Sequence, residues 1–200
     1  MKRTVWLWQL FGFAFTALGG TLLHFLFDLT GGSLWAAPFS GVNESTWEHM
    51  KLMLWPMLIF AVVQSFFFKD YRNFWCVKLR GTLLGLWLIP IFYYTYNGII
   101  GKSSDWINIT IFFLSAAIAY AYEAVKLNNN GIAADEIGIR ARAEGSGDGR
   151  RQVGGAGADC ASPRRAFIAL CAIALLFVLF TFATPGLGIF KDPITGTFGI

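Results

Sequence analysis

The feature that most constrains this chain is the recurrence of apolar runs about 20 residues long with few charges. A helix of that length crosses the hydrocarbon core of a bilayer, where backbone polar groups must bond within their own segment. Charged residues make up 14% of the chain, against about 25% in soluble domains. We therefore predict an all-α membrane protein, a bundle of five transmembrane helices over about 5–27, 47–68, 81–100, 106–125 and 166–184.

The basic residues predict the orientation of this bundle. Of 16 lysines and arginines, all but Lys51, Lys102 and Lys191 fall at one end of the predicted spans. Cytoplasmic segments carry such an excess, so the prediction is N-in/C-out. The lipid bilayer is then the expected partner, and the scattered basic residues form no nucleic-acid surface. A homo-oligomer and an unknown membrane partner protein both stay open.

The chain is predicted to form a single membrane domain over 1–200. Within it, 128–165 is rich in glycine, alanine and arginine and shows no apolar periodicity, which predicts a flexible cytoplasmic loop. Residues 185–200 follow the last span and form the predicted extracytoplasmic tail.

Polar residues gather at the predicted outer ends of the spans. The stretch SGVNESTWEHMKLMLWP holds several of them at the start of the second span. Ionisable groups at the edge of a span indicate a functional site, because they are costly to bury unless paired or used. The candidate site residues are His24, Asp28, Asn43, Glu44, Ser45, Glu48, His49, Tyr96, Asn97, Asp105 and Asp192.

A metal centre is the first interpretation of this site. His24 and Asp28 are four residues apart and share a helix face. Together with Glu48 and His49 they would supply two nitrogens and two carboxylates, which suits Zn²⁺ or another divalent transition metal. Glu44 and Glu48 are the candidate catalytic residues, with Glu44 as a base for metal-bound water. The substrate would be a lipid head group or an envelope precursor.

The same residues also fit a structural interpretation. The letters STWE match a capping box, with Ser45 as N-cap and Glu48 three residues later. Lys51 would pair with Glu48 on the helix surface. Asp192, which precedes a proline, would form a turn.

The motifs HFLFDLTGG, GVNESTWEHMKLMLWP, YYTYNGIIG with DWINI, and FTFATPGLGIFKDPITGTFGI resemble the DUF6512 family of small bacterial integral membrane proteins. The resemblance covers the chain outside 128–165. It implies a multi-pass protein of the bacterial cytoplasmic membrane, and it implies no reaction.

Two further functions stay open on the sequence. A small transporter, or a subunit of one, would use the histidines and carboxylates as a proton or cation relay. Polar groups are expected to be absent from the inner halves of the predicted spans, so no continuous path completes it. A structural or sensory membrane protein would use the outer polar groups only to hold the helices together.

Overall fold

The computed structural model describes residues 2–69, 71, 73–101, 104–143 and 162–199. These residues form five α-helices and one short 3-10 turn, with no strand apart from a single antiparallel bridge between Lys191 and Phe198. The elements are α1 (Lys2–Leu29), α2 (Thr46–Ser65), α3 (Phe74–Ile100), α4 (Asp105–Ala143), α5 (Pro163–Phe182) and η1 (Gly188–Phe190).

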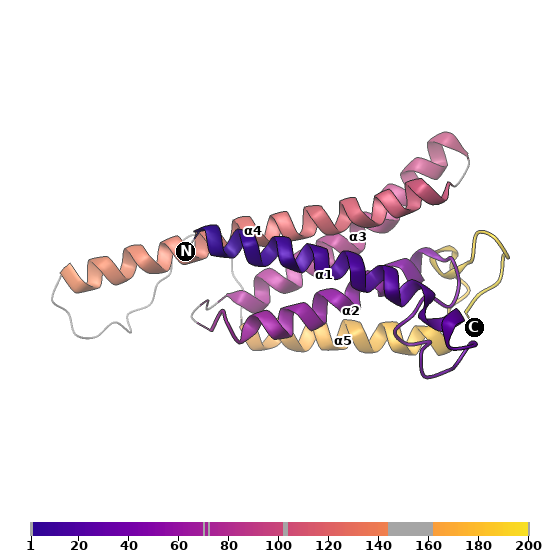
Figure 1. The fold of residues 1–200 in the computed structure, drawn as a ribbon, viewed down its shortest axis with the longest axis horizontal. Coiled ribbons are helices and arrows are strands. Elements are labelled where there is room, and N and C mark those ends of the chain that lie inside the picture. The colour runs from indigo at the N-terminus through magenta and orange to yellow at the C-terminus, as the bar shows by residue number, and fades with distance from the viewer. Residues whose placement is uncertain (1, 70, 72, 102–103, 144–161, 200) are drawn as a thin grey trace.

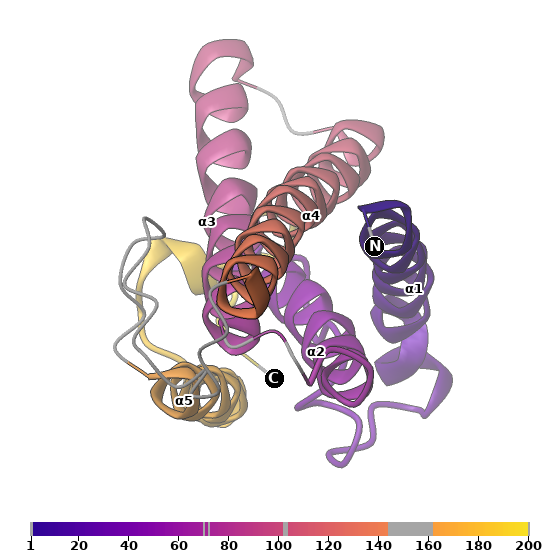
Figure 2. The same ribbon diagram turned by 90° about the vertical axis from the view of Figure 1, so that its left-hand side faces the viewer.

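The five helices run along one common direction, and α2 contacts each of the other four (Figures 1 and 2). We call the end where α1 begins the N-side and the end where the chain finishes the C-side. The loop between α1 and α2, the 3-10 turn and the tail all lie on the C-side (Figure 1). The distal part of α4 extends beyond the bundle on the N-side (Figure 1).

Four of the helices are long and apolar enough to cross a membrane: Arg3–Leu29, Phe74–Ile100, Asp105–Asn129 and Pro163–Phe182. The all-helical fold is thus confirmed for the described residues, and the four apolar helices fit a membrane protein. α2 is not among the four, because Glu48, His49 and Lys51 in its first turns make it less apolar. Large apolar side chains are exposed around the bundle, an amount of exposed apolar surface that suits lipid rather than water.

Two boundaries differ from the expectation. α3 begins at Phe74, so Lys78, expected in a loop, lies inside a helix. α4 continues to Ala143, where a loop was expected from 128. The letters AADEIGIRARA have little apolar periodicity but are rich in alanine and arginine, which have high helix propensity. The rest of the predicted loop up to 161 lies outside the described residues.

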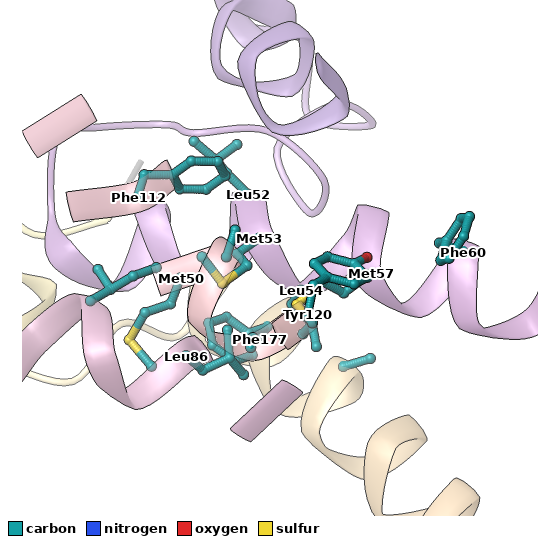
Figure 3. Packing of buried hydrophobic residues seen from close by; sticks show 14 residues of the cluster. Met50, Leu52, Met53, Leu54, Met57, Phe60, Leu86, Phe112, Tyr120 and Phe177 are labelled. Carbon is teal, nitrogen blue, oxygen red and sulfur yellow. The ribbon is translucent and has the colours of Figure 1, made fainter. Parts of the chain in front are cut away.

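The main core surrounds α2 (Figure 3). Met50, Met53, Leu54 and Met57 are nearly or fully buried along this helix. α3, α4 and α5 each add one or two large buried side chains, and the residues labelled in Figure 3 outside α2 are Leu86, Phe112, Tyr120 and Phe177. Methionine adapts to irregular gaps, so a helix buried on several sides is well packed by it.

Glycines on α1 allow close approach to this core. A Cβ added at Gly12 would lie 2.5 Å from Phe60 Cε1 and 2.6 Å from Tyr120 Cε1. Helices in membranes associate through such small residues, because lipid supplies no hydrophobic drive between them. Gly12 therefore determines how near α1 comes to α2 and α4.

We predict that Gly12→Ala lowers the free energy of unfolding by about 1–3 kcal/mol through overpacking. Gly98→Ala is the matched control, since a Cβ there meets no atom within 4 Å and the backbone is helical. Alanine is the better helix former, so the control is neutral or slightly more stable. Thermal unfolding in detergent measures both. Equal melting temperatures for the two variants would contradict the close approach of α1.

Candidate functional site

The C-side site begins with the cap of α2. Ser45 is the N-cap, as predicted, and its hydroxyl accepts a hydrogen bond from the Glu48 amide at 3.4 Å. The Ser45 amide, in turn, donates to Asn43 Oδ1 at 2.9 Å. The capping box is therefore only half formed, because Asn43 takes the place that the Glu48 side chain was expected to fill.

The Glu48 carboxylate instead meets Lys51. Their Oε2 and Nζ atoms are 2.6 Å apart, and both side chains are buried. The pairing was predicted, but its surface position was wrong. The expectation counted only the helix spacing, whereas α5 and the loop 30–45 cover this face of α2.

Every donor of this lysine is used. Lys51 Nζ also donates to the Ala37 carbonyl at 2.7 Å and to Thr181 Oγ1 at 3.1 Å. Glu48 Oε2 accepts a further bond from the Val42 amide at 3.0 Å. A buried ion pair holds when its remaining hydrogen-bonding groups are satisfied. This pair therefore joins α2, α5 and the loop 30–45 on the C-side.

Glu44 lies between the two histidines. Its carboxylate oxygens are 3.7 Å from His24 Nε2 and 3.6 Å from His49 Nε2. One ligand atom from each of the three residues lies within 4.8 Å of the others. The histidine rings meet edge-on, with centroids 5.6 Å apart. Two histidines expected in one site are thus neighbours, and Glu44 joins them.

These separations are too long for good hydrogen bonds. They are close to the spacing of two ligand atoms around tetrahedral zinc, which is about 3.4 Å for metal–ligand bonds of about 2.0–2.2 Å. His49 Nδ1 lies 3.0 Å from the Ser45 carbonyl oxygen. A neutral His49 that donates there keeps its Nε2 lone pair directed at Glu44, which is how supporting hydrogen bonds orient metal-binding histidines.

The C-terminal tail contacts the backbone of Glu44 through Asp192. Asp192 is buried, and its carboxylate accepts hydrogen bonds from the amides of Ile194 at 2.7 Å and Thr195 at 3.2 Å. Burial raises the pKa of Asp192, but these bonds and one from the Glu44 backbone outweigh it and hold the pKa below its ordinary value. Asn43 Nδ2 donates to the Gly199 carbonyl at 3.0 Å.

Four other predicted site residues are outside the group of His24, Glu44 and His49. Asp28 and Asp105 are exposed at the ends of α1 and α4. Asn97 Nδ2 donates to the Tyr93 carbonyl at 3.0 Å, one turn back on α3. Tyr96 is half-buried near the end of the same helix. None of these four belongs to the three-residue group found among the described residues.

A pocket opens beside Glu44 and His49. Its polar lining includes Thr46, Tyr93 and Asn108, and its apolar lining comes from Ile89, Ile111 and Phe112. A second depression shares Thr46 and Tyr93 and extends along the tail over 191–196. Two of the candidate metal ligands, Glu44 and His49, therefore border a small cavity of about 20 Å³ with both polar and apolar lining residues.

Sequence reasoning missed a second polar group, on the N-side. Lys78 of α3 and Glu123 of α4 form a buried ion pair, with Nζ and Oε2 2.5 Å apart. The expectation that the inner halves of the spans hold no polar group was therefore wrong. A signal was present, because Glu123 interrupts an apolar run and an ionisable residue inside a span marks a site.

Comparison with known proteins identifies the family to which this chain belongs. The chain belongs to DUF6512, a family of unknown function, whose model matches residues 2–130. The match includes α1 to α3 with both histidines and most of α4. The C-terminal motif that also carried the resemblance lies outside it. No curated protein and no solved structure matches the chain.

We predict that Lys51→Met destabilises the protein by about 3–5 kcal/mol, because it leaves the Glu48 charge buried without a partner. Lys51→Met/Glu48→Gln removes both charges, and we expect it to recover most of that loss. Chemical unfolding in detergent measures the three free energies. A double variant no more stable than the single one would show that the pair is not the source of the loss.

Proposed function

We propose that this chain is a five-span protein of the bacterial cytoplasmic membrane, oriented N-in/C-out, with a divalent transition-metal centre on its extracytoplasmic side. The group His24, Glu44 and His49 carries the proposal. The centre would activate water for hydrolysis of a lipid or envelope substrate. This assignment keeps both histidines of the sequence hypothesis and gives Glu44 the part of a ligand.

The fifth span in this proposal is α2. Its 20 residues correspond to about 30 Å of helix, which is the thickness of the hydrocarbon core. Its charged side chains lie near its C-side end and are paired. The N-side carries the exposed cations Arg3, Lys69, Arg80 and Lys126, which favours that side as cytoplasmic.

Three protein ligands suit a catalytic rather than a structural zinc site, because the fourth position stays open for water. A bound divalent ion lowers the pKa of that water toward neutrality. The Glu44 side chain is 41% exposed, so a substrate can reach this position. The expected set with Asp28 and Glu48 is less favoured, since Glu48 is engaged by Lys51 and Asp28 is exposed.

The pocket supports an amphiphilic substrate. Its apolar lining, Ile89, Ile111 and Phe112, would contact the hydrocarbon part of a substrate. Its polar side holds Thr46 and Tyr93 next to Glu44 and His49, where a head group would lie. The pocket itself is small, about 20 Å³, so such a substrate would reach Glu44 and His49 from the adjoining depression of about 360 Å³ that shares Thr46 and Tyr93.

The topology gives the first test. We predict that a reporter enzyme active only outside the cytoplasm, such as alkaline phosphatase, is active when fused after Ile200. Green fluorescent protein fused at the same position stays dark. Five spans reverse the side of the chain between its ends, whereas four would not. An inactive phosphatase and a fluorescent fusion would exclude the five-span N-in/C-out topology.

Metal content gives the second test. We predict about one zinc, iron or manganese ion per chain in detergent-purified protein, measured by elemental mass spectrometry. His24→Ala/His49→Ala and Glu44→Ala lose the ion, because each removes part of the proposed ligand set. Asp28→Asn is the matched control, one helical turn from His24 and outside the set, and it keeps the metal.

Two outcomes would contradict the proposal. Purified wild-type protein that takes up no zinc, iron or manganese would remove the metal centre. Loss of the metal in Asp28→Asn but not in Glu44→Ala would instead return the ligand set to the one suggested by sequence alone.

A further inference from the structure

The buried pair of Lys78 and Glu123 differs from the pair on the C-side in one respect. Lys51 uses all three of its donors, and Glu48 Oε2 accepts from both Lys51 and the Val42 amide. Glu123 Oε1, in contrast, is buried and has no hydrogen-bond partner among the described residues. The only other bond of Lys78 Nζ among these residues is a long one, 3.4 Å, to Gln9 Oε1. We call the pair of Lys51 and Glu48 the closed pair and the pair of Lys78 and Glu123, with its unbonded carboxylate oxygen, the open pair.

More unused polar groups lie around the open pair. Gln9 Nε2 and both amide atoms of Gln64 are buried without a partner among the described residues. Gln64 lies one helical turn from Phe60, whose ring is 5.5 Å from Lys78 Nζ, so both project from the same face of α2. Buried polar groups are usually paired, and a cluster of exceptions calls for a ligand or a function.

We propose that this cluster is a cation-exchange site, at which a small monovalent cation replaces the ammonium group of Lys78 on the Glu123 carboxylate. The inference rests on the N-side residues alone and does not depend on the metal centre. We call the site formed by Gln9, Gln64, Lys78 and Glu123 the exchange site.

The charge of the surroundings requires a monovalent cation. Glu123 faces Lys78 from α3 and Tyr120 one turn away on α4, and Gln9 from α1 contacts Lys78. Lys78 is the only charged group among these three in the described chain. The pair is neutral as a unit. A buried net charge is strongly unfavourable, so the exchange must leave the site neutral. A divalent ion would not.

The step balances in atoms and charge. The cation binds the Glu123 carboxylate, and one N–H bond of Lys78 breaks. The electron pair stays on Nζ, and the proton passes to water. The site then holds a neutral amine, a carboxylate and one cation, so its net charge is zero before and after. One proton is released for each cation bound.

The ligands present suit a small alkali cation. Gln9 Oε1 and Glu123 Oε2 both lie within 3.4 Å of the present Nζ position. Glu123 Oε1 adds a free carboxylate oxygen. The rings of Phe60, Phe74 and Tyr120 lie 5.5–5.6 Å from Nζ and favour a positive charge there. Phe74 also belongs to a buried apolar cluster with Val5, Phe68 and Leu127, so exchange requires local movement of buried groups.

The first measurement is proton release. Detergent-purified full-length protein in weak buffer with a pH-sensitive dye is mixed with NaCl, LiCl or choline chloride at equal ionic strength. We expect about one proton per chain with Na⁺ or Li⁺ and none with choline. Lys78→Met/Glu123→Gln abolishes the release, and this neutral replacement of the whole pair is expected to fold. Lys126→Gln, an exposed lysine on α4, is the matched control and releases protons like the wild type.

The second measurement does not require wild-type exchange to be fast. Lys78→Met leaves the Glu123 charge without a partner, so Na⁺ stabilises this variant by binding it. Its melting temperature rises with NaCl but not with choline chloride, and the double variant shows no such rise. Release equal for Na⁺ and choline, or no release together with no Na⁺-dependent rise, would overturn the proposal. Release that persists in His24→Ala/His49→Ala separates this site from the metal centre.

Discussion

Two buried lysine ammonium groups constrain the arrangement of this bundle more than any apolar contact. A charge inside a low-dielectric core needs a partner within a few ångströms, so each lysine fixes a neighbour. Lys51 joins α2 to α5 and to the loop 30–45. Lys78 joins α3 to α4 and reaches Gln9 of α1. Apolar packing around α2 then fills the space between the two pairs.

The closed pair also decides which carboxylate meets the histidines. Glu48 lies one residue before His49, but Lys51 and the Val42 amide hold its carboxylate on the buried face. Glu44 precedes the N-cap and stays half-exposed, where both imidazoles reach it. The tail holds the Glu44 backbone through Asp192. The candidate metal site is therefore a consequence of how α2 starts and how the chain ends.

Local features of this fold could be predicted, and distant pairings could not. The helices followed from apolar run lengths, and the Ser45 cap followed from spacing. The nearness of His24 and His49 followed from placing both at one end of the spans. The choice of Glu44 over Glu48 depends on α5 and the loop, which no helical spacing encodes. Lys78 and Glu123 are 45 residues apart, and only their position within apolar segments could have indicated burial.

The two ends of the bundle differ in how completely their polar groups are used, and this difference separates structural from functional charge. A pair that satisfies every donor gains nothing from a ligand, so Lys51 and Glu48 are best explained by stability. A pair with an unused carboxylate oxygen and neighbouring unused amides can still bind a ligand. The Cβ space of Gly81 is filled by the Glu123 side chain, so α3 approaches α4 where the carboxylate lies. The proposed monovalent cation on the N-side therefore follows from the neutral charge of the pair, and the wider depression on the C-side, about 360 Å³, favours an amphiphile.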